Sequence, residues 1–370
     1  MLSTVSLAGC EFGFSSKDKR VKLTAPTYTS YDNYIEWTEV ENAVGYIVSV
    51  NGEEKAVQKT CNYTVDTDKA VNVQVKAVAE ETSKEYKDSD YGSTFTRAAD
   101  PVPSETLDVE QLQEMANTHD KASDLYMIDL PSSSEAYSIS FAETSSQYQI
   151  AVPEEVRLLH VTTDADGATV SFKLEARATP FIFEMAGAKL TGRSDNAVIN
   201  ASAASVSSDV TVVIRSLTEE EGCARGNTLT AGNSTVTGSS GKGGTFFTSG
   251  GKGGTGGTGP AAVITDKVYF SGNASITLTG GKGGTGGRGG NNSANLGGDG
   301  GNGGTGGNAV SGTAYINIPN RLVSLFGGDG GNGGSPGSSF NAFASPTSGK
   351  SGSKGGSAAN IVIFAGEVKK

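Results

Sequence analysis

Cysteine, histidine and long apolar runs are scarce in this 370-residue chain. Its three cysteines, Cys10, Cys61 and Cys223, have neither metal-ligand spacing nor the density of a disulfide framework, and Cys61 and Cys223 fall in different expected domains. The two histidines, His119 and His160, have no neighbours in sequence that would complete a metal site. No apolar run approaches the roughly 20 residues that span a bilayer. These absences predict free thiols, no resident metal or cofactor and no membrane-spanning helix. A disulfide between Cys61 and Cys223 is the alternative in an oxidising compartment.

A basic excess is also missing. The formal net charge is −11, which argues against binding to nucleic acid or to anionic lipid head groups, because both need basic patches. Nucleophile motifs are absent, and the match to G-x-G-x-x-G at residues 251–256 lacks the strand-turn-helix context that gives that pattern meaning. The chain is therefore expected to be a non-enzymatic protein with no nucleic-acid partner.

Glycine, in contrast, is abundant, with 52 residues. Pairs of glycines recur every third residue in four tracts, which span residues 250–258, 280–290, 297–308 and 327–335. A polyproline II type helix has three residues per turn, so a Gly-Gly-X repeat leaves two of its edges bare and gathers every side chain on the third. Flexible linkers are the alternative, because ordering a residue costs about 1–2 kcal/mol and glycine loses most. A linker has no reason to keep one register, so we predict packed tracts that exchange backbone hydrogen bonds.

The third positions of these tracts carry the candidate binding residues. Their side chains are polar or charged and recur at intervals of about 9.3 Å, three times the helical rise. A rigid polar array of this kind suits sugars, and the alternative is the solvated edge of a scaffold. Tracts that begin with Lys can pair with tracts that begin with Asp. The residues predicted to bind a ligand are Lys252, Thr255, Lys282, Thr285, Arg288, Asp299, Asn302, Asp329 and Asn332.

The amino terminus resembles that of bacterial lipoproteins. Leu7-Ala8-Gly9-Cys10 matches the lipobox, and the resemblance implies cleavage before Cys10 and acylation of that cysteine. A full leader also has a charged start and an apolar segment of about 7–15 residues, whereas only Met1 to Ser6 precede the box, so part of the leader is expected to be missing. Residues 1–22 are then a leader remnant and tether. The resemblance implies a protein held on the extracellular face of a bacterial membrane, with the lipid as its only membrane contact.

Residues 23–98 read as short alternating strands separated by turns. Trp37 closes one strand, Asn51-Gly52 follows another as a strong hairpin signal, and residues 71–78 alternate apolar with polar side chains. With Ser89-Asp90-Tyr91 near the last strand, this pattern resembles a fibronectin type III module, which implies a β-sandwich. The resemblance says little about activity. Trp37 is expected in the core rather than on a ligand platform.

A proline-containing linker at residues 99–106 precedes a second pattern. Apolar residues at positions 109, 112, 115 and 116 form one stripe of a short amphipathic helix, and short strands follow, punctuated by Gly, Asn, Asp or Ser. This order resembles the entry of bacterial surface parallel β-helices, in which a helix plugs the open end. The resemblance implies a helix-capped, right-handed parallel β-solenoid over residues 107–249, which continues with polyglycine II insertions over residues 250–370. The expected fold class is all-β.

The tracts resemble two groups of polyglycine II proteins, the adhesins of phage tail-fibre tips and the springtail antifreeze proteins. With the lipobox and the sandwich module, the first resemblance implies a lipid-anchored cell-surface adhesin for a glycan or a protein ligand. One alternative is a polysaccharide lyase or hydrolase of the parallel β-helix type, although Glu219-Glu220-Glu221 reads as a solvated turn and His160 as a strand-face residue. Another is a structural stalk or an ice-binding protein; the charged third positions are poorly suited to ice binding.

Overall fold

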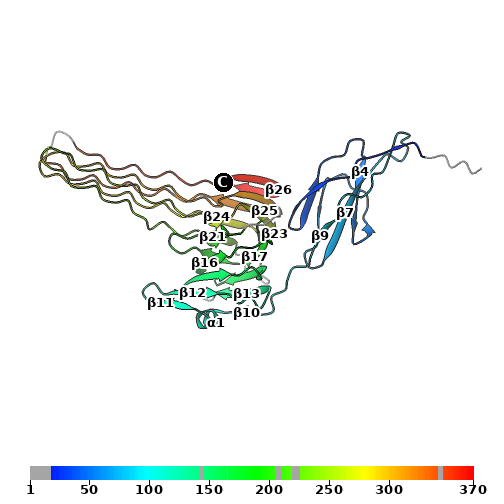
Figure 1. Cartoon of the computed structure of the whole chain (residues 1–370), viewed down its shortest axis with the longest axis horizontal. Coiled ribbons are helices and arrows are strands. Elements are labelled where there is room, and N and C mark those ends of the chain that lie inside the picture. The colour runs from blue at the N-terminus through cyan, green and yellow to red at the C-terminus, as the bar shows by residue number, and fades with distance from the viewer. Residues whose placement is uncertain (1–17, 142–144, 165, 205–210, 219–225, 341–344) are drawn as a thin grey trace, which may run out of the picture. The chain divides into compact units, whose positions relative to one another are not determined.

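The chain folds into two compact units. The computed structural model describes residues 18–141, 145–164, 166–204, 211–218, 226–340 and 345–370. Unit 1 ends at Ala99 and unit 2 begins at Asp100. Nearly all regular structure in both units is β, so the all-β prediction is confirmed (Figure 1).

Unit 1 consists of short strands in small sheets. Its strands are Val21–Lys22 (β1), Tyr28–Tyr31 (β2), Tyr34–Trp37 (β3), Gly45–Val50 (β4), Glu53–Glu54 (β5), Asn62–Thr64 (β6), Val71–Val78 (β7), Tyr86–Lys87 (β8) and Phe95–Arg97 (β9). β1 pairs with β8 in parallel. Two antiparallel sheets have the orders β2-β3-β6 and β5-β4-β7-β9.

The core of unit 1 follows from the alternation in β7. Val71, Val73, Val75 and Ala77 of that strand are buried in one cluster, because successive side chains of a strand point to opposite faces. Trp37 joins this cluster as expected, in an edge-on contact with Tyr46 at 5.5 Å between ring centroids. The turn after β4 has positive φ at Asn51 (53°) and Gly52 (85°), which confirms the hairpin that the Asn-Gly pair predicts.

Unit 2 contains one short helix and seventeen strands among its described residues. The helix is Val109–Glu114 (α1), and the strands are Thr106–Leu107 (β10), Thr118–Asp120 (β11), Leu125–Asp129 (β12), Ala136–Phe141 (β13), Gln147–Val152 (β14), Leu158–Thr163 (β15), Ala168–Leu174 (β16), Phe181–Ala186 (β17), Lys189–Thr191 (β18), Ile199–Asn200 (β19), Val212–Leu217 (β20), Asn227–Thr230 (β21), Val263–Ile264 (β22), Lys267–Gly272 (β23), Ile276–Thr279 (β24), Thr313–Phe326 (β25) and Asn360–Lys369 (β26).

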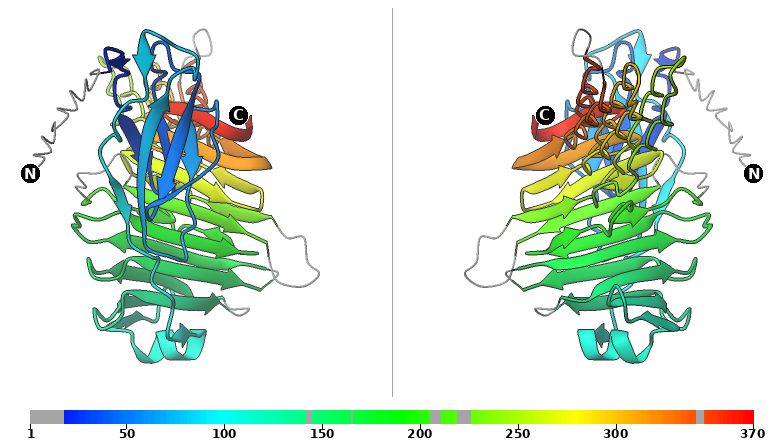
Figure 2. Two further views of the ribbon diagram at one scale, coloured as in Figure 1. Left: turned by 90° about the vertical axis from the view of Figure 1, so that its right-hand side faces the viewer. Right: turned by 90° about the vertical axis from the view of Figure 1, so that its left-hand side faces the viewer.

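Helix α1 lies at the start of the strand stack (Figure 2). Its first turn is closed by a capping box, in which the Asp108 side chain accepts from the Gln111 N–H and the Gln111 side chain accepts from the Asp108 N–H. Leu112 is buried in the large core of unit 2, and Met115 and Ala116 pack against that core. The apolar stripe that predicts the helix is therefore the face that covers the first strands.

The strands of unit 2 pair mainly in parallel with strands two or three places later in the chain. One series runs β13, β15, β17, β20, β23, β25 and β26. A second runs from β12 and β14 through β16 to the shorter strands β18 and β19 and then to β21, β22 and β24. The chain therefore returns to the same place once per coil, and the coils stack from α1 to β26 (Figure 2).

Register in the stack aligns apolar side chains into buried columns. One column, fully or almost fully buried, has a single residue from each of six coils: Tyr137, Leu159, Phe183, Ile214, Phe270 and Ile316. Burying a side chain of this size stabilises the fold by about 1.5–3 kcal/mol. A column of this kind fixes the register between each coil and the next. The same register determines where the hairpins inserted between the strands leave the stack.

Three long hairpins leave the stack at one position. They depart after Thr230, Thr279 and Phe326, which are paired residues in adjacent coils, so the hairpins leave in register. Each hairpin has an outgoing and a returning tract, and the tracts run side by side away from the stack (Figure 1). We call the six together the tract slab. The outgoing tracts form layer A, residues 231–244, 280–291 and 327–338, and the returning tracts form layer B, residues 250–260, 297–308 and 347–357.

Backbone hydrogen bonds join every tract of the slab to its neighbours. Within a layer, the N–H that follows a third position donates to the third-position carbonyl of the next tract, as Gly253 does to Asp299 at 2.9 Å. Between layers, glycine N–H groups donate to carbonyl oxygens that belong mostly to glycine and, in the first hairpin, also to Val236, Ser239, Lys242 and Pro260. One chain of such bonds crosses all six tracts at 2.7–2.8 Å, each N–H donating to the next carbonyl, from Gly352 through Gly331, Gly304, Gly284 and Gly257 to Val236. The tracts are thus ordered, as the register argument predicts.

Two of the six tracts lie outside the four that the repeat predicts. Residues 231–244 and 347–357 have Ser, Thr, Val or Lys where the repeat would require glycine. They are the first and the last tract of the slab, so each lacks neighbours on one side and tolerates side chains there. The inner tracts have no such freedom: a Cβ on Gly301 or Gly304 would lie 1.9 Å from the carbonyl oxygen of Gly254 or Gly257.

We predict that Gly304→Ala destabilises the slab while leaving the coil stack folded. The added methyl group overlaps a backbone oxygen that cannot move without breaking its own hydrogen bonds, so we expect a loss of about 1–3 kcal/mol or more. Thermal unfolding and amide exchange at Gly284 and Gly331 measure the effect. Thr255→Ala, on an exposed third position, is the matched control and should change stability by at most about 0.5 kcal/mol. Equal protection of those amides in Gly304→Ala would contradict the packing argument.

Candidate functional site

The predicted binding residues lie on two faces of the slab rather than on one. The glycines of layers A and B face each other, so the third-position side chains point outward, and all nine predicted residues are exposed. The face of layer A carries Lys282, Thr285, Arg288, Asp329 and Asn332, and the face of layer B carries Lys252, Thr255, Asp299 and Asn302. A single array of nine residues is therefore replaced by two separate arrays.

Lys-led and Asp-led tracts are neighbours on both faces. On layer B the Gly253 N–H donates to the Asp299 carbonyl at 2.9 Å, which places Lys252 in the row beside Asp299. On layer A the same bond between Gly283 and Asp329, also 2.9 Å, places Lys282 beside Asp329. Opposite charges therefore alternate across the start of each face, as the tract sequences suggest.

Asn and Asp side chains on layer B bind backbone rather than solvent. Oδ1 of Asp299 accepts from the Thr347 N–H at 2.7 Å, Oδ1 of Asn302 from the Lys350 N–H at 3.1 Å, and Oδ1 of Asn308 from the Gly356 N–H at 2.8 Å. These N–H groups belong to third positions, which point out of the slab and have no backbone partner in it. Asp299 and Asn302 thus hold the next tract in place, a role that sequence analysis missed.

The pKa of Asp299 reflects this role. The backbone N–H of Thr347, then the Thr347 hydroxyl at 3.0 Å and the charge of Lys252, together hold the pKa of the Asp299 carboxyl below its usual value. The signal for this role is present in the sequence, since Asp299, Asn302 and Asn308 all occupy third positions of one tract. Their capping role can be recognised only when the tract that lies beside them is known.

On layer A, the five predicted side chains are uncommitted, meaning that they bind no other group of the described protein. Among the described residues, those of Lys282, Thr285, Arg288, Asp329 and Asn332 make no hydrogen bond or ion pair with other protein groups. Two other asparagines cap backbone N–H groups on this face. Oδ1 of Asn233 accepts from the Lys282 N–H and Oδ1 of Asn291 accepts from the Ser338 N–H, both at 3.0 Å. Of the predicted residues whose side chains make no such bond, five therefore lie on layer A and two, Lys252 and Thr255, on layer B.

A second cluster of charged residues lies on the flank of the coil stack. His160, Glu184 and Arg215 occupy equivalent positions of β15, β17 and β20. Glu184 lies 3.4 Å from His160 Nδ1 and 3.0 Å from an Arg215 nitrogen, and Asp100 lies 2.5 Å from the same Arg215 nitrogen. His160 is on a strand face as expected. Its partners could have been found by aligning Leu159-His160-Val161, Phe183-Glu184-Met185 and Ile214-Arg215-Ser216 as successive coils.

The electrostatics of this cluster suit a structural ion-pair ladder better than acid catalysis. Burial raises the pKa of Glu184, but the hydrogen bond from His160 and the charge of Arg215 outweigh it and hold that pKa below its usual value. A glycoside hydrolase requires one carboxyl with a raised pKa to protonate the leaving group. Glu184, whose pKa is lowered, is therefore not placed to be that acid, and Asp100 pairs with the same Arg215 nitrogen.

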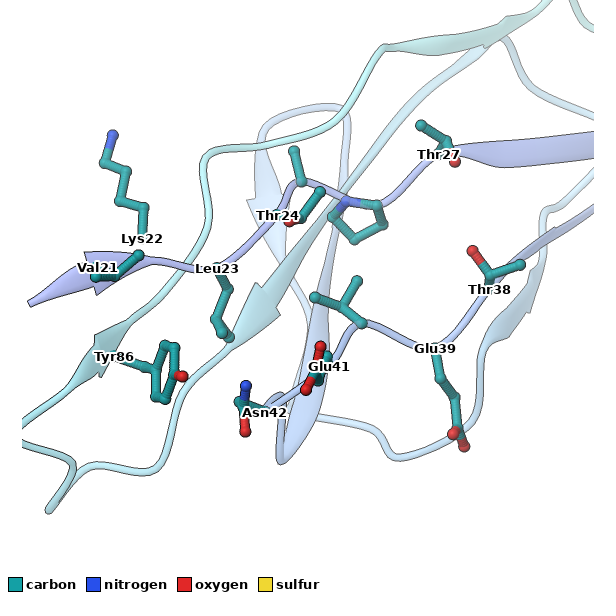
Figure 3. A pocket seen from close by; sticks show the side chains of 13 residues that line it. Val21, Lys22, Leu23, Thr24, Thr27, Thr38, Glu39, Glu41, Asn42 and Tyr86 are labelled. Atoms are coloured by element: carbon teal, nitrogen blue, oxygen red, sulfur yellow. The ribbon is translucent and has the colours of Figure 1, made fainter.

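Other candidate sites add little chemistry. A hollow of about 460 Å³ in unit 1 is lined by residues 21–27 and 38–42 and by Tyr86, with Lys22, Glu39 and Glu41 as its charged groups (Figure 3). The described residues contain no group of three or more His, Cys, Asp or Glu that could hold a metal ion. Cys61 is a free thiol. Cys10, Cys223 and Glu219-Glu220-Glu221 lie outside the described residues.

We predict that acid loosens the last tract at Thr347 before it loosens the same tract at Lys350. The folded-state pKa of Asp299 is lowered, so its contribution is complete above the ordinary Asp pKa of about 3.9 and is lost as the pH falls through the lower, folded value. Asn302 caps Lys350 in the same way but does not titrate. Amide protection factors measured through this range should fall for Thr347 and stay constant for Lys350, and they should stay constant for both in Asp299→Asn. A parallel loss at both amides would refute the assignment.

Comparison with known proteins adds no relative. Neither a family model nor a curated protein nor a solved structure matches this chain. Inferences about its function therefore depend on its own residues and their geometry.

Proposed function

We propose that this protein is a lipid-anchored, non-enzymatic adhesin of a bacterial cell surface that binds glycans through the face of layer A. In this proposal unit 1 is a fibronectin type III-like sandwich, and unit 2 is a helix-capped parallel β-solenoid whose inserted tracts pack as polyglycine II helices. The parallel pairing of strands once per coil and the lateral bonds between tracts support the second assignment. Two antiparallel sheets around Trp37 support the first.

One observation carries the proposal: layer A presents uncommitted polar side chains on a backbone that is already fixed. Lys282, Thr285 and Arg288 follow one another at intervals of about 9.3 Å, and Asp329 and Asn332 stand in the adjacent tract. A ligand that meets this face does not have to order the backbone, so the entropic cost of binding is reduced. Hydroxyl-rich polymers with repeating units match such a periodic set of donors and acceptors.

The anchor in this proposal is Cys10. The lipobox at Leu7-Ala8-Gly9-Cys10 supports acylation there, and two or three acyl chains hold a protein stably to a membrane. No helix in the described part of the chain is long and apolar enough to cross a bilayer. The polysaccharide-cleaving alternative has one observation in its favour, the cluster of Asp100, Glu184 and Arg215. The lowered pKa of Glu184 is unfavourable to acid catalysis by that carboxyl.

We predict that changes on layer A remove glycan binding and that matched changes on layer B do not. Lys282→Gln with Arg288→Gln should weaken binding by about tenfold or more, because charge-assisted hydrogen bonds are the stronger ones. Lys252→Gln with Thr255→Ala is the control on the opposite face. Purified variants are compared on a glycan array and by calorimetry with the polysaccharide that the parent chain binds. Equal binding by both variants, or no glycan bound by the parent, sinks the proposal.

We predict that Cys10→Ser abolishes incorporation of labelled fatty acid into the protein and releases it from the membrane fraction of expressing cells. The thiol at this position is the group that the lipobox offers for acylation. Cys61→Ser, at a free thiol of unit 1, is the control and should keep both label and membrane association. Metabolic labelling followed by fractionation provides the measurement, and label retained by Cys10→Ser would exclude this anchor.

A further inference from the structure

The turns at the far end of the slab expose aromatic side chains. The first two turns, residues 245–249 and 292–296, lie at the end opposite the coil stack (Figure 1). Phe246 and Phe247, on the first turn, are 70% and 89% exposed, and Phe340, which follows the last outgoing tract, is 77% exposed. The Phe340 N–H donates to the Asn295 carbonyl of the second turn at 3.1 Å, and we call the two turns together with Phe340 the tip. Adjacent, largely exposed phenyl rings mark an interaction surface.

The first turn is held rigidly by a buried amide. The Thr245 and Thr248 backbones exchange hydrogen bonds at 3.0 and 3.2 Å, and their hydroxyls lie 2.8 Å apart. Asn292 of the next hairpin, only 2% exposed, donates to the carbonyl oxygens of both threonines at 3.0 and 2.7 Å. Phe246 and Phe247 pack edge-on at 5.2 Å between ring centroids. The turn is thus fixed in a form that presents two phenyl rings to solvent.

Charge is distributed in zones behind this tip. The segments 245–249 and 292–296 contain no charged residue. Lys242, Lys252 and Arg288 stand three or four residues behind the turns, about 9–12 Å at the rise of this helix type. Asp299, whose carboxylate is engaged by Thr347 and neighbours Lys252, lies at a similar depth. Lys350 stands beside Asn302, one repeat farther from the turns.

The slab is basic although the chain is acidic. Its tracts and turns contain six basic residues, Lys242, Lys252, Lys282, Arg288, Lys350 and Lys354, against two acidic ones, Asp299 and Asp329. The slab therefore carries +4, and the remainder of the chain −15, which sums to the net −11. The negative charge of the whole chain therefore does not prevent this part of the molecule from binding an anionic surface.

We propose that the aromatic tip inserts into an anionic lipid surface. Phenyl rings without a polar atom enter the boundary of the acyl chains, the uncharged Ser, Thr and Asn groups of the turns occupy the head-group layer, and the basic residues behind them face the lipid phosphates. This order of apolar, polar and basic zones matches the depth profile of a bilayer surface. A protein groove would accept the rings but gives no reason for the basic zone at that depth. This lipid-binding role goes beyond the proposed glycan-binding face, since the aromatic turn shares no residue with that face; of the basic residues that stand nearest the turns, Arg288 belongs to both.

The test is flotation of the full chain with vesicles. Cys10→Ser is present throughout, so that no acyl chain contributes. Vesicles of phosphatidylglycerol and phosphatidylethanolamine should bind the protein, vesicles of phosphatidylcholine should bind it less, and added salt should weaken binding. Phe246→Ser with Phe247→Ser should lower the apparent affinity by about tenfold or more. Val236→Ser, at an exposed apolar residue of layer A away from the tip, is the matched control and should bind as the parent does.

A spectroscopic variant reports insertion directly. Trp37 is buried in unit 1, so Phe247→Trp adds an indole whose emission can be followed as a difference from the parent. Its emission should shift to the blue and be quenched by brominated lipids when anionic vesicles are added. Vesicle binding that persists without the two phenyl rings, or no binding to anionic vesicles, overturns this inference. Either result leaves glycan binding by layer A unaffected, so failure of one proposal is distinguishable from failure of the other.

Discussion

The structure of unit 2 depends on how closely the tract backbones approach one another. The coils of the stack return in register, and their hairpins leave from paired residues, so the spacing between coils is passed on to the tracts. At that spacing a Cβ on Gly301 or Gly304 would lie 1.9 Å from a neighbouring carbonyl oxygen. Only glycine fits on the two inward edges. In return, N–H and C=O groups that would otherwise need water bond to each other, and the linked bonds across six tracts strengthen the set.

The third position is the one place in each repeat where a side chain fits, and the two layers use it differently. On layer B, Asp299 and Asn302 satisfy outward N–H groups of the last tract, and the neighbouring charge of Lys252 stabilises Asp299 as a carboxylate. On layer A, Asn233 and Asn291 at the two ends of the tracts cap their neighbours, which leaves the positions between them uncommitted. The two faces thus differ in which third positions bond to the next tract: Asp299 and Asn302 do so on layer B, whereas the five predicted residues of layer A do not.

The periodic patterns of the sequence predict many of the individual elements of this fold. They do not predict which strands and tracts lie beside one another. Alternation in residues 71–78, the Asn51-Gly52 turn and the stripe that buries Leu112 are local signals, and each element forms as they predict. The three-residue repeat likewise predicts ordered tracts. Neighbouring tracts of one layer are bonded through residues that lie far apart in sequence, 48 positions in the case of Asp299 and Thr347. No local sequence pattern predicts that pairing. For that reason the two-layer arrangement, the capping role of Asp299 and the ladder of His160, Glu184 and Arg215 were missed, although each residue was visible.

Rigidity connects the two surfaces proposed here. Glycine loses more conformational entropy on ordering than any other residue. Here the loss occurs during folding, where hydrogen bonds within the slab and the apolar columns that fix the coils offset it. A ligand or a membrane then meets groups already in place, on the face of layer A and on the turn that Asn292 holds. A flexible Gly-rich segment with the same side chains would have to be ordered at the moment of binding. The packing that excludes side chains from the interior is therefore also what gives the remaining side chains fixed positions at the surface.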